Sequence, residues 1–234
     1  MTVPDVQLIL VLGLLCAALF SLLLRQHERH TRAAGGMLVA LGDSITYGQG
    51  IPVEDNFVSL LSRRLGMPIV NAGVPGDTTE DVLARLDRDV LDRKATAVIV
   101  FLGGNDFLWP LLMRQDGFRT EAQILRASRE FTETPIAATF KNIRTIIERI
   151  HAAHVKVVLV GFSTEFLDTF EEEFARIARE ERVAGYVSNA LAGILFNKKY
   201  LVSETVPQVH PNARGHKLIA DRIQPVLEKV LQSK

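Results

Sequence analysis

The amino-acid sequence predicts an α/β fold in which helices cover both faces of a parallel sheet. Two observations indicate this fold: short apolar runs recur from residue 37 onward, and stretches with a helical apolar period separate them. Strands that alternate with helices form βαβ units, whose strands run parallel and are buried on both faces. The expected domain is therefore a three-layer α/β/α sandwich with a five-stranded parallel sheet.

Five apolar runs are expected to form the strands, and four amphipathic stretches the main helices. The strands are MLVAL (37–41), PIVN (68–71), AVIVFL (97–102), VKVVLV (155–160) and, more weakly, RVAGYV (182–187). Within each helix the apolar residues recur mostly three or four positions apart and so share one face. These sets are Val82, Leu83, Leu86, Val90 and Leu91; Ile136, Phe140, Ile143, Ile147 and Ile150; Leu167, Phe170, Phe174 and Ile177; and Leu218, Ile219, Ile223, Val226, Leu227 and Val230.

Residues 107–134 fit this alternation poorly, because connections in an α/β unit usually have about two to six residues. The segment begins with an apolar cluster from Phe107 to Met113. Two interpretations remain open for it: the wall or lid of a ligand pocket beside a strand end, or a small extra helix packed on the domain.

Composition excludes several classes of protein. The 234 residues suit one domain with a short appendage, and 27 basic residues balance 27 acidic ones, so no net charge favours nucleic acid as a partner. Cys16 is the single cysteine, which rules out an intrachain disulfide. No Cys/His cluster has the spacing of a zinc site, and no metal is expected.

Residues 1–24 are expected to form a transmembrane anchor, because Val6 to Leu24 is an uncharged apolar run of about nineteen residues, within the length that crosses a bilayer. A secretory signal peptide would carry positive charge before a shorter apolar run and a small-residue cleavage site after it. A lipoprotein centred on Cys16 would need a small residue where Leu15 stands. A buried core helix is the remaining alternative.

The polar residues 25–36, RQHERHTRAAGG, are interpreted as a linker, which leaves residues 37–234 as the folded domain. Arg25, Arg29 and Arg32 follow the apolar run, and basic residues beside a span favour the cytoplasmic side.

Chemically distinctive residues follow three of the predicted strands and precede the last helix. They are Gly42–Ser44, Gly73–Thr79, Gly103–Asp106 and Val209–Asn212. Taken singly, each has a plain explanation as a helix cap, a turn or a surface histidine. Because the carboxyl ends of parallel strands meet at one edge of a sheet, the four segments are expected to converge there.

In these four segments the sequence resembles the GDSL/SGNH hydrolases, in particular their bacterial thioesterase/lysophospholipase-like arylesterases. GDS, GxPGDTT, GGND and VHPN occur in the family's order, and the resemblance covers about Met37 to Leu231. It implies the SGNH-type sandwich, which agrees with the alternation of strands and helices. It also implies a serine hydrolase without metal or cofactor.

The resemblance assigns a role to each matching residue. Ser44 is the expected nucleophile and His210 the base that takes its proton. The backbone N–H groups of Ser44 and Gly76 and the side-chain amide of Asn105 are the expected oxyanion hole. Asp43 is expected to orient its loop rather than to react. Apart from the resemblance, the position of Gly76 after the second predicted strand predicts that it opens a helix.

The sequence departs from the family pattern where an acid should stand three residues before the histidine, since Pro207 occupies that position. Proline cannot orient an imidazole. Glu204 looks like the family's acid displaced by an insertion, and it is the candidate third member of the triad. A Ser–His dyad, a slow enzyme and a degenerate one remain alternatives.

The sequence therefore predicts a hydrolase of carboxylic esters or thioesters, with acyl, lysophospholipid-like or acetyl substrates. A catalytically weak binding module at the membrane and an acyltransferase are the alternatives. The chain is expected to cross a bacterial inner membrane once. The side of the membrane that the domain occupies stays open, because the arginines favour the cytoplasmic side, whereas hydrolases of this kind are often exported. His216, in the first turn of the last helix, is expected to face solvent.

Overall fold

The computed structural model describes residues 36–106, 133–161, 168–195, 197–203 and 209–233. The chain divides into two units, Met1–Gly36 and Met37–Lys234, and the fold belongs to the second. Within the described ranges no helix is long and apolar enough to cross a membrane. The predicted anchor at 1–24 lies outside these ranges, as do most of the linker and of the segment 107–134.

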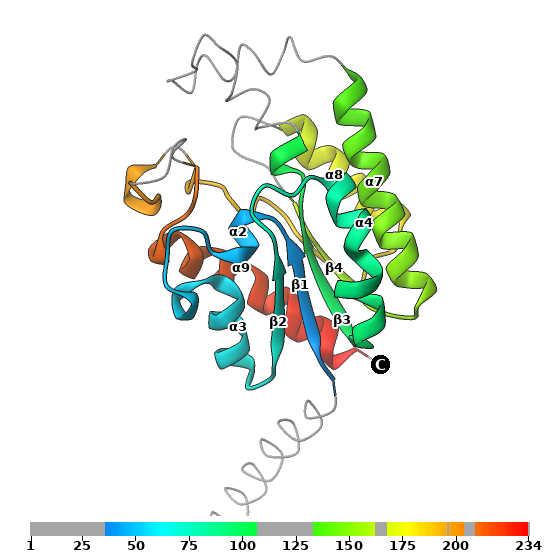
Figure 1. Ribbon diagram of the computed structural model, residues 1–234, viewed down its shortest axis with the longest axis horizontal. Coiled ribbons are helices and arrows are strands. Elements are labelled where there is room, and N and C mark those ends of the chain that lie inside the picture. Colours follow the sequence, from blue (N-terminus) through cyan, green and yellow to red (C-terminus); the bar gives the residue numbers. More distant parts are fainter. Residues whose placement is uncertain (1–35, 107–132, 162–167, 196, 204–208, 234) are drawn as a thin grey trace, which may run out of the picture. The chain divides into compact units, whose positions relative to one another are not determined.

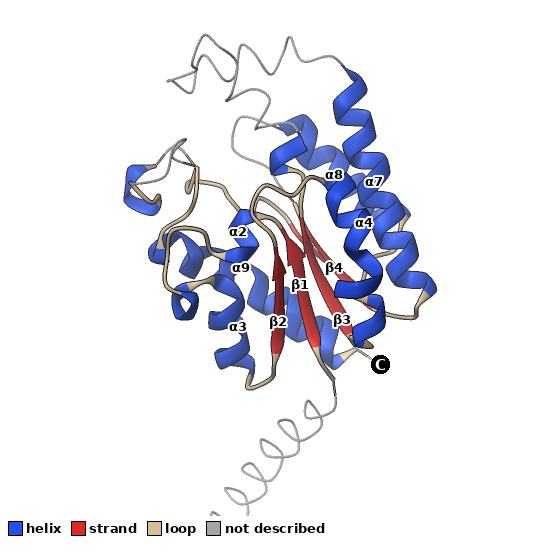
Figure 2. Cartoon of the chain, viewed as in Figure 1, coloured by secondary structure: helices blue, strands red, loops and turns tan. Residues whose placement is uncertain are grey.

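A five-stranded parallel sheet forms the centre of the domain (Figure 2). Its strands are β1 (Leu38–Gly42), β2 (Ile69–Gly73), β3 (Ala97–Phe101), β4 (Lys156–Val160) and β5 (Gly185–Val187), in the order β2-β1-β3-β4-β5. Every residue of β1 and β3 is buried, as the continuous apolar runs predict for strands covered on both faces. The predicted sheet is confirmed.

Helices cover the two faces of the sheet (Figure 1). On one face α3 (Phe57–Leu65) packs against α9 (Ala213–Gln232); on the other, α7 (Glu133–Ala152) contacts both α4 (Thr79–Asp89) and α8 (Asp168–Glu180). The short elements are α2 (Ser44–Tyr47) and the 3-10 turns Val53–Asp55, Leu91–Arg93 and Lys198–Tyr200. All four predicted main helices are present, whereas α3 was not predicted.

The strand order places a topological switch point at β1. The chain passes from β1 to β2 on one side and then returns to β3 on the other side. The helices α3 and α7, which follow β1 and β3 in the chain, therefore lie on opposite faces of the sheet, and ligands bind such sheets at the carboxyl ends of the strands beside the switch point. Ser44 and Asn105 follow β1 and β3 and lie at this point.

Candidate active site

Ser44 is the first residue of α2 and comes two residues after the end of β1. The carboxylate of Asp43 accepts the backbone N–H of Ile45 at 2.9 Å and so caps this short helix. The helix lies close against β2, since a Cβ on Gly73 would stand 2.2 Å from the backbone nitrogen of Tyr47. Ser44 is consequently held at the strand end, with 7% of its surface exposed.

His210 lies directly against Ser44, although 166 residues separate them in the chain. The Nε2 atom of His210 is 3.0 Å from the Oγ atom of Ser44. That distance permits proton transfer from a serine hydroxyl to an imidazole. The histidine is 9% exposed, and this burial lowers its pKa from the ordinary value of 6.5. A neutral imidazole, the form that accepts a proton, is therefore favoured.

Asn212 fixes the backbone that carries His210. Its side-chain oxygen accepts the N–H groups of Arg214 and Gly215 and caps α9, while its amide group donates to the carbonyl oxygens of Lys199 and Leu201. Next to it, Pro211 and Leu201 form an antiparallel bridge, and the N–H of Val202 donates to the carbonyl of His210 at 2.9 Å.

The Nδ1 atom of His210 is buried and has no hydrogen-bond partner among the described residues. In a Ser–His–acid triad this atom donates to the carboxylate that orients the ring. Glu204, the candidate for that carboxylate, and Pro207 lie outside the described residues.

The loop after β2 carries Gly76 in a left-handed conformation, with φ of +89°, that a side chain would strain. Its turn is closed by a hydrogen bond from the N–H of Asp77 to the carbonyl of Val74. The expectation that Gly76 opens a helix is wrong, because α4 begins at Thr79. Its N-cap is Thr78, which forms a capping box with Asp81 and satisfies the first free N–H groups of the helix.

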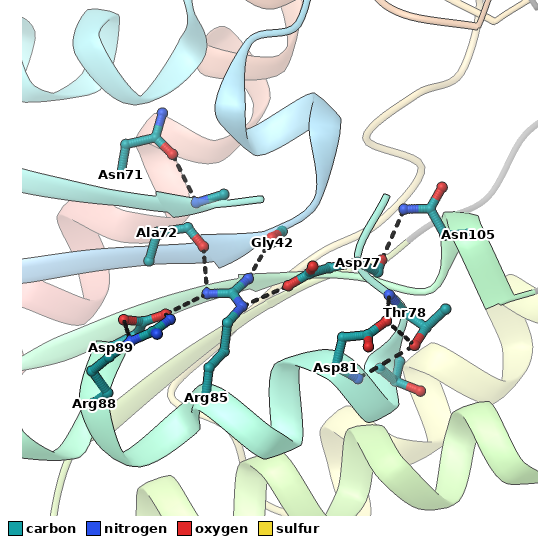
Figure 3. A network of polar contacts seen from close by, with 12 residues as sticks. Gly42, Asn71, Ala72, Asp77, Thr78, Asp81, Arg85, Arg88, Asp89 and Asn105 are labelled. Atoms are coloured by element: carbon teal, nitrogen blue, oxygen red, sulfur yellow. Dashed lines mark hydrogen bonds and ion pairs between the residues drawn. The ribbon is translucent and has the colours of Figure 1, made fainter. Parts of the chain in front are cut away.

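Asn105 joins the loops that follow β2 and β3. Its Nδ2 atom donates to the carbonyl of Asp77 at 2.8 Å (Figure 3). An amide group has two hydrogens, so one remains for a ligand. The next residue, Asp106, accepts the N–H and the hydroxyl of Thr79 at the start of α4. These contacts tie the end of β3 to the loop that contains Gly76.

Arg85 of α4 lies beneath the same loops (Figure 3). It donates to the carboxylates of Asp77 at 2.6 Å and Asp89 at 2.8 Å, and to the carbonyls of Gly42 and Ala72 at 3.0 Å each. The guanidinium therefore contacts the ends of β1 and β2 and the loop between β2 and α4 at once.

Burial raises the pKa of two carboxyl groups beside these loops, those of Asp43 and Asp106. Desolvation raises the pKa of Asp43 to about 7, and the negative charges of Asp106 and Asp77 add to the rise. Burial also raises the pKa of Asp106, against the lowering effect of its bonds from Thr79. Asp43 and Asp77 thus lie near enough to interact electrostatically.

His216 is buried, and the expectation that it faces solvent is wrong. It is 0% exposed in the first turn of α9, its ring stacks on Phe57, and its Nδ1 atom accepts the N–H of Phe57 at 3.2 Å. Burial lowers its pKa to about 4, with a smaller contribution from His210. Its Nε2 atom has no partner within the described part of the chain.

To three polar residues around the site, sequence reasoning assigned no role or a wrong one. Asn212 had a recognisable signal, since an asparagine directly before an apolar helical pattern is a strong N-cap. Arg85 had a weaker signal in its position four residues before Asp89. His216 had none, because neighbours from α3 bury it. No group of metal-ligating side chains occurs within the described ranges.

Comparison with known proteins agrees with this geometry. The chain is 25% identical over 211 residues to Esterase TesA of Pseudomonas aeruginosa, covering 86% of this chain and 92% of the relative. It is 24% identical to Thioesterase 1/protease 1/lysophospholipase L1 of Escherichia coli K12, covering 83% and 86%. An arylesterase of Vibrio mimicus is 35% identical over 80 residues, 32% of this chain and 40% of the relative.

Solved structures show the same fold. The crystal structure of TesA superposes with a TM-score of 0.64 at 23% identity, over 83% of this chain and 99% of that one. The esterase EstA of Pseudoalteromonas superposes with 0.62 at 20% identity, over 85% and 100%. The profile of the GDSL-like Lipase/Acylhydrolase family matches residues 40–218. The chain therefore belongs to the GDSL-like lipase/acylhydrolase family of hydrolases.

Proposed function

We propose that this hydrolase cleaves carboxylic esters or thioesters through an acyl intermediate on Ser44. The observation that carries the proposal is the 3.0 Å contact between the Oγ atom of Ser44 and the Nε2 atom of His210. A serine hydroxyl is a weak nucleophile until a base takes its proton, and a neutral, buried imidazole at this distance is a suitable base.

In the proposed reaction the Ser44 oxygen attacks the carbonyl carbon while His210 takes the hydroxyl proton. The negative charge moves to the carbonyl oxygen, where the N–H groups of Ser44 and Gly76 and the free amide hydrogen of Asn105 are the proposed donors. His210 then returns the proton to the leaving alcohol or thiol. Water repeats the sequence on the acyl-enzyme and regenerates Ser44.

Glu204 is the proposed third member of the triad. The N–H of Val202 donates to the carbonyl of His210, so Glu204 follows only two residues after a residue in direct contact with the base. A buried imidazole N–H without an acceptor is costly, which gives Nδ1 of His210 a need for such a partner.

Short acyl or aryl esters and acyl thioesters are the proposed substrates. The relatives are named as an esterase, a thioesterase/lysophospholipase and an arylesterase. In the described part of the chain, Tyr47 and Val74 are among the exposed large apolar side chains; Tyr47 ends α2, the short helix that begins at Ser44, and Val74 lies on the loop that carries Gly76. Apolar surface beside the nucleophile suits an acyl or aromatic group.

We also propose that residues 1–24 anchor the enzyme in a membrane, by the length and lack of charge of Val6 to Leu24. The test is extraction of the cell membrane fraction with sodium carbonate. An anchored chain stays in the pellet, whereas a variant that starts at Met37 is released. Appearance of the intact chain in the supernatant would contradict the anchor.

The test of the catalytic proposal is turnover of p-nitrophenyl acetate and butyrate by the full chain, purified in mild detergent. Replacing Ser44 or His210 by alanine is expected to abolish turnover. Asn105→Ala is expected to lower kcat by about 10²–10³-fold, the usual cost of one oxyanion donor. Gln224→Ala is the control, because the Gln224 side chain bonds Arg64 and Glu228 and none of the loops that carry the proposed donors.

The same assay separates the alternatives. Turnover that yields acylated alcohol when an alcohol competes with water would identify an acyltransferase. Folded wild-type protein that shows no turnover above the Ser44→Ala background, on these and longer acyl substrates, would identify a binding module and refute the enzyme.

A further inference from the structure

We propose that Arg85 is a positioning residue that sets the geometry of the oxyanion hole. This inference rests on the proposed function, because it concerns the same site. Arg85 touches none of the proposed reacting groups. It acts through the loops that carry them, and the network in Figure 3 supplies the connection.

One guanidinium fixes the nucleophile loop and the oxyanion loop together. Its Nη2 atom donates to the carbonyl of Gly42, two residues before Ser44, and its Nε atom donates to the carboxylate of Asp77, directly after Gly76. The carbonyl of Gly42 also accepts the N–H of Val74. One rigid, planar group therefore binds both loops, in addition to the direct bond between them.

Asp77 connects Arg85 to the side chain of Asn105. Asp77 binds Arg85 through its carboxylate and accepts the Asn105 amide through its carbonyl. A shift of Asp77 would move Gly76 and Asn105 together. Because oxyanion donors act at distances of about 2.7–3.1 Å, a displacement of even a fraction of an ångström weakens both.

Among the described residues, no other cation in the network can replace Arg85. The side chains of Arg85, Asp77 and Asp89 are only 10%, 13% and 11% exposed, so their charges are weakly screened. Arg88 and Arg93 also contact Asp89, but their side chains are 71% and 40% exposed, and within the described residues these contacts reach neither strand end. A lysine offers a point charge without the planar fork that reaches four acceptors.

The expected consequence is a specific loss of catalysis in folded protein. Arg85→Met is expected to lower kcat roughly 10- to 100-fold with KM changed less than threefold, since misplaced donors weaken the transition state more than the ground state. Arg85→Lys should recover part of this loss. Arg88→Met, the matched control, should stay within twofold of wild type in kcat.

The experiment measures kcat and KM for p-nitrophenyl butyrate at a temperature well below each variant's unfolding midpoint, with Ser44→Ala in the same series. A purely structural Arg85 would lower the midpoint and leave kcat unchanged, so the two readouts separate the roles. Wild-type turnover at the Ser44→Ala background would refute the proposed function instead.

A second variant keeps the test decisive if Arg85→Met fails to fold. Asp77→Asn preserves the shape of the side chain and removes the charge that binds Arg85. It is expected to lower kcat about three- to tenfold, again with little change in KM. Wild-type kcat in both Arg85→Lys and Asp77→Asn would overturn the proposal.

Discussion

The two halves of the candidate site are built in different ways. The nucleophile side, formed by the loops after β1, β2 and β3, is held by the charged network of Arg85, Asp77 and Asp89 and by strand-end carbonyls. The histidine side, residues 197–203 and 209–216, is held by backbone contacts and the cap of Asn212. Both of its buried imidazoles, His210 and His216, have a nitrogen without a partner in the described ranges.

This difference follows from the origin of the two sides in the fold. Parallel strands fix the spacing of the loops on the nucleophile side, so a single guanidinium can bind two strand ends. The histidine side enters from the connection between β5 and α9, whose described residues form only the single bridge between Leu201 and Pro211 and no strand of the sheet. The nucleophile side should therefore tolerate little steric change, while the histidine side should depend on a single acceptor for Nδ1 of His210.

Glu204→Gln should give the largest effect, because it removes the proposed acceptor on the histidine side. Loss of the triad acid allows the wrong imidazole tautomer, so we expect kcat to fall more than 100-fold, toward the roughly 10⁴-fold cost of such a change. A carboxylate at Nδ1 raises the pKa of the histidine, so the midpoint of the pH profile of kcat/KM should also move to lower pH.

The control for this variant is Glu172→Gln, which alters an exposed glutamate on α8. Wild-type kcat and an unchanged pH midpoint in Glu204→Gln would leave a Ser–His dyad and remove Glu204 from the site.

Gly73→Ala should displace α2 from β2 and so disrupt the nucleophile side. The added Cβ would lie 2.2 Å from the nitrogen of Tyr47 and 2.8 Å from the carbonyl oxygen of Asp43, both backbone atoms that cannot turn away. We expect a loss of about 3 kcal/mol in the free energy of unfolding and about a 100-fold fall in turnover, as α2 is pushed from its place. Denaturant unfolding and ester hydrolysis measure the two effects.

Gly76→Ala provides the matched comparison. A Cβ there meets no described atom within 4 Å, so only the strain of its φ of +89° remains, about 1–2 kcal/mol. Equal losses in the two variants would show that steric contact between α2 and β2 does not hold the nucleophile.

The same contrast explains which parts of the structure the sequence could predict. Strands β1, β3 and β4 were predictable because they are nearly continuous apolar runs, and the four main helices because their apolar faces are regular. The signals of β2 and β5 are weaker, since Asn71 and Gly185 interrupt their apolar residues. Helix α3 was missed, although its ends carry recognisable signals. The Asn56 side chain accepts the N–H of Ser59, and Gly66 ends the helix with φ of +64°.

In the site, the residues that belong to a sequence motif could be predicted, and those outside the motifs could not. Ser44 and His210 stand in motifs, and the structure brings them together. Arg85 acts from the middle of α4. Its i,i+4 partner Asp89 leaves a local signal, but no local pattern encodes its contacts with β1, with β2 and with the loop between β2 and α4. His216 is buried by Phe57, and burial by a residue that far away in the chain leaves no trace in sequence periodicity.

Two buried groups, one on each side, should respond to pH with opposite sign. Asp43 has a pKa of about 7 in the folded protein and 3.8 as a free group, so between these values the folded state holds the extra proton and stability falls as pH rises. His216 has a pKa of about 4 against 6.5, so the unfolded state holds the proton and stability rises with pH. In wild type the two contributions largely cancel between pH 4.5 and 6.5, at about 1.4 kcal/mol per pKa unit.

Replacing either group should leave the pH dependence of stability that the other group contributes. On acidification from pH 6.5 to about 4.5, Asp43→Asn should lose roughly 2 kcal/mol more stability than wild type, and His216→Gln roughly 2 kcal/mol less. Both replacements retain an oxygen that can accept the same backbone N–H. Denaturant unfolding across this pH range measures the difference, and parallel curves for wild type and both variants would show that neither group titrates differently on folding. Curves that diverge in the stated directions would show that each side of the site holds its buried group in the neutral form.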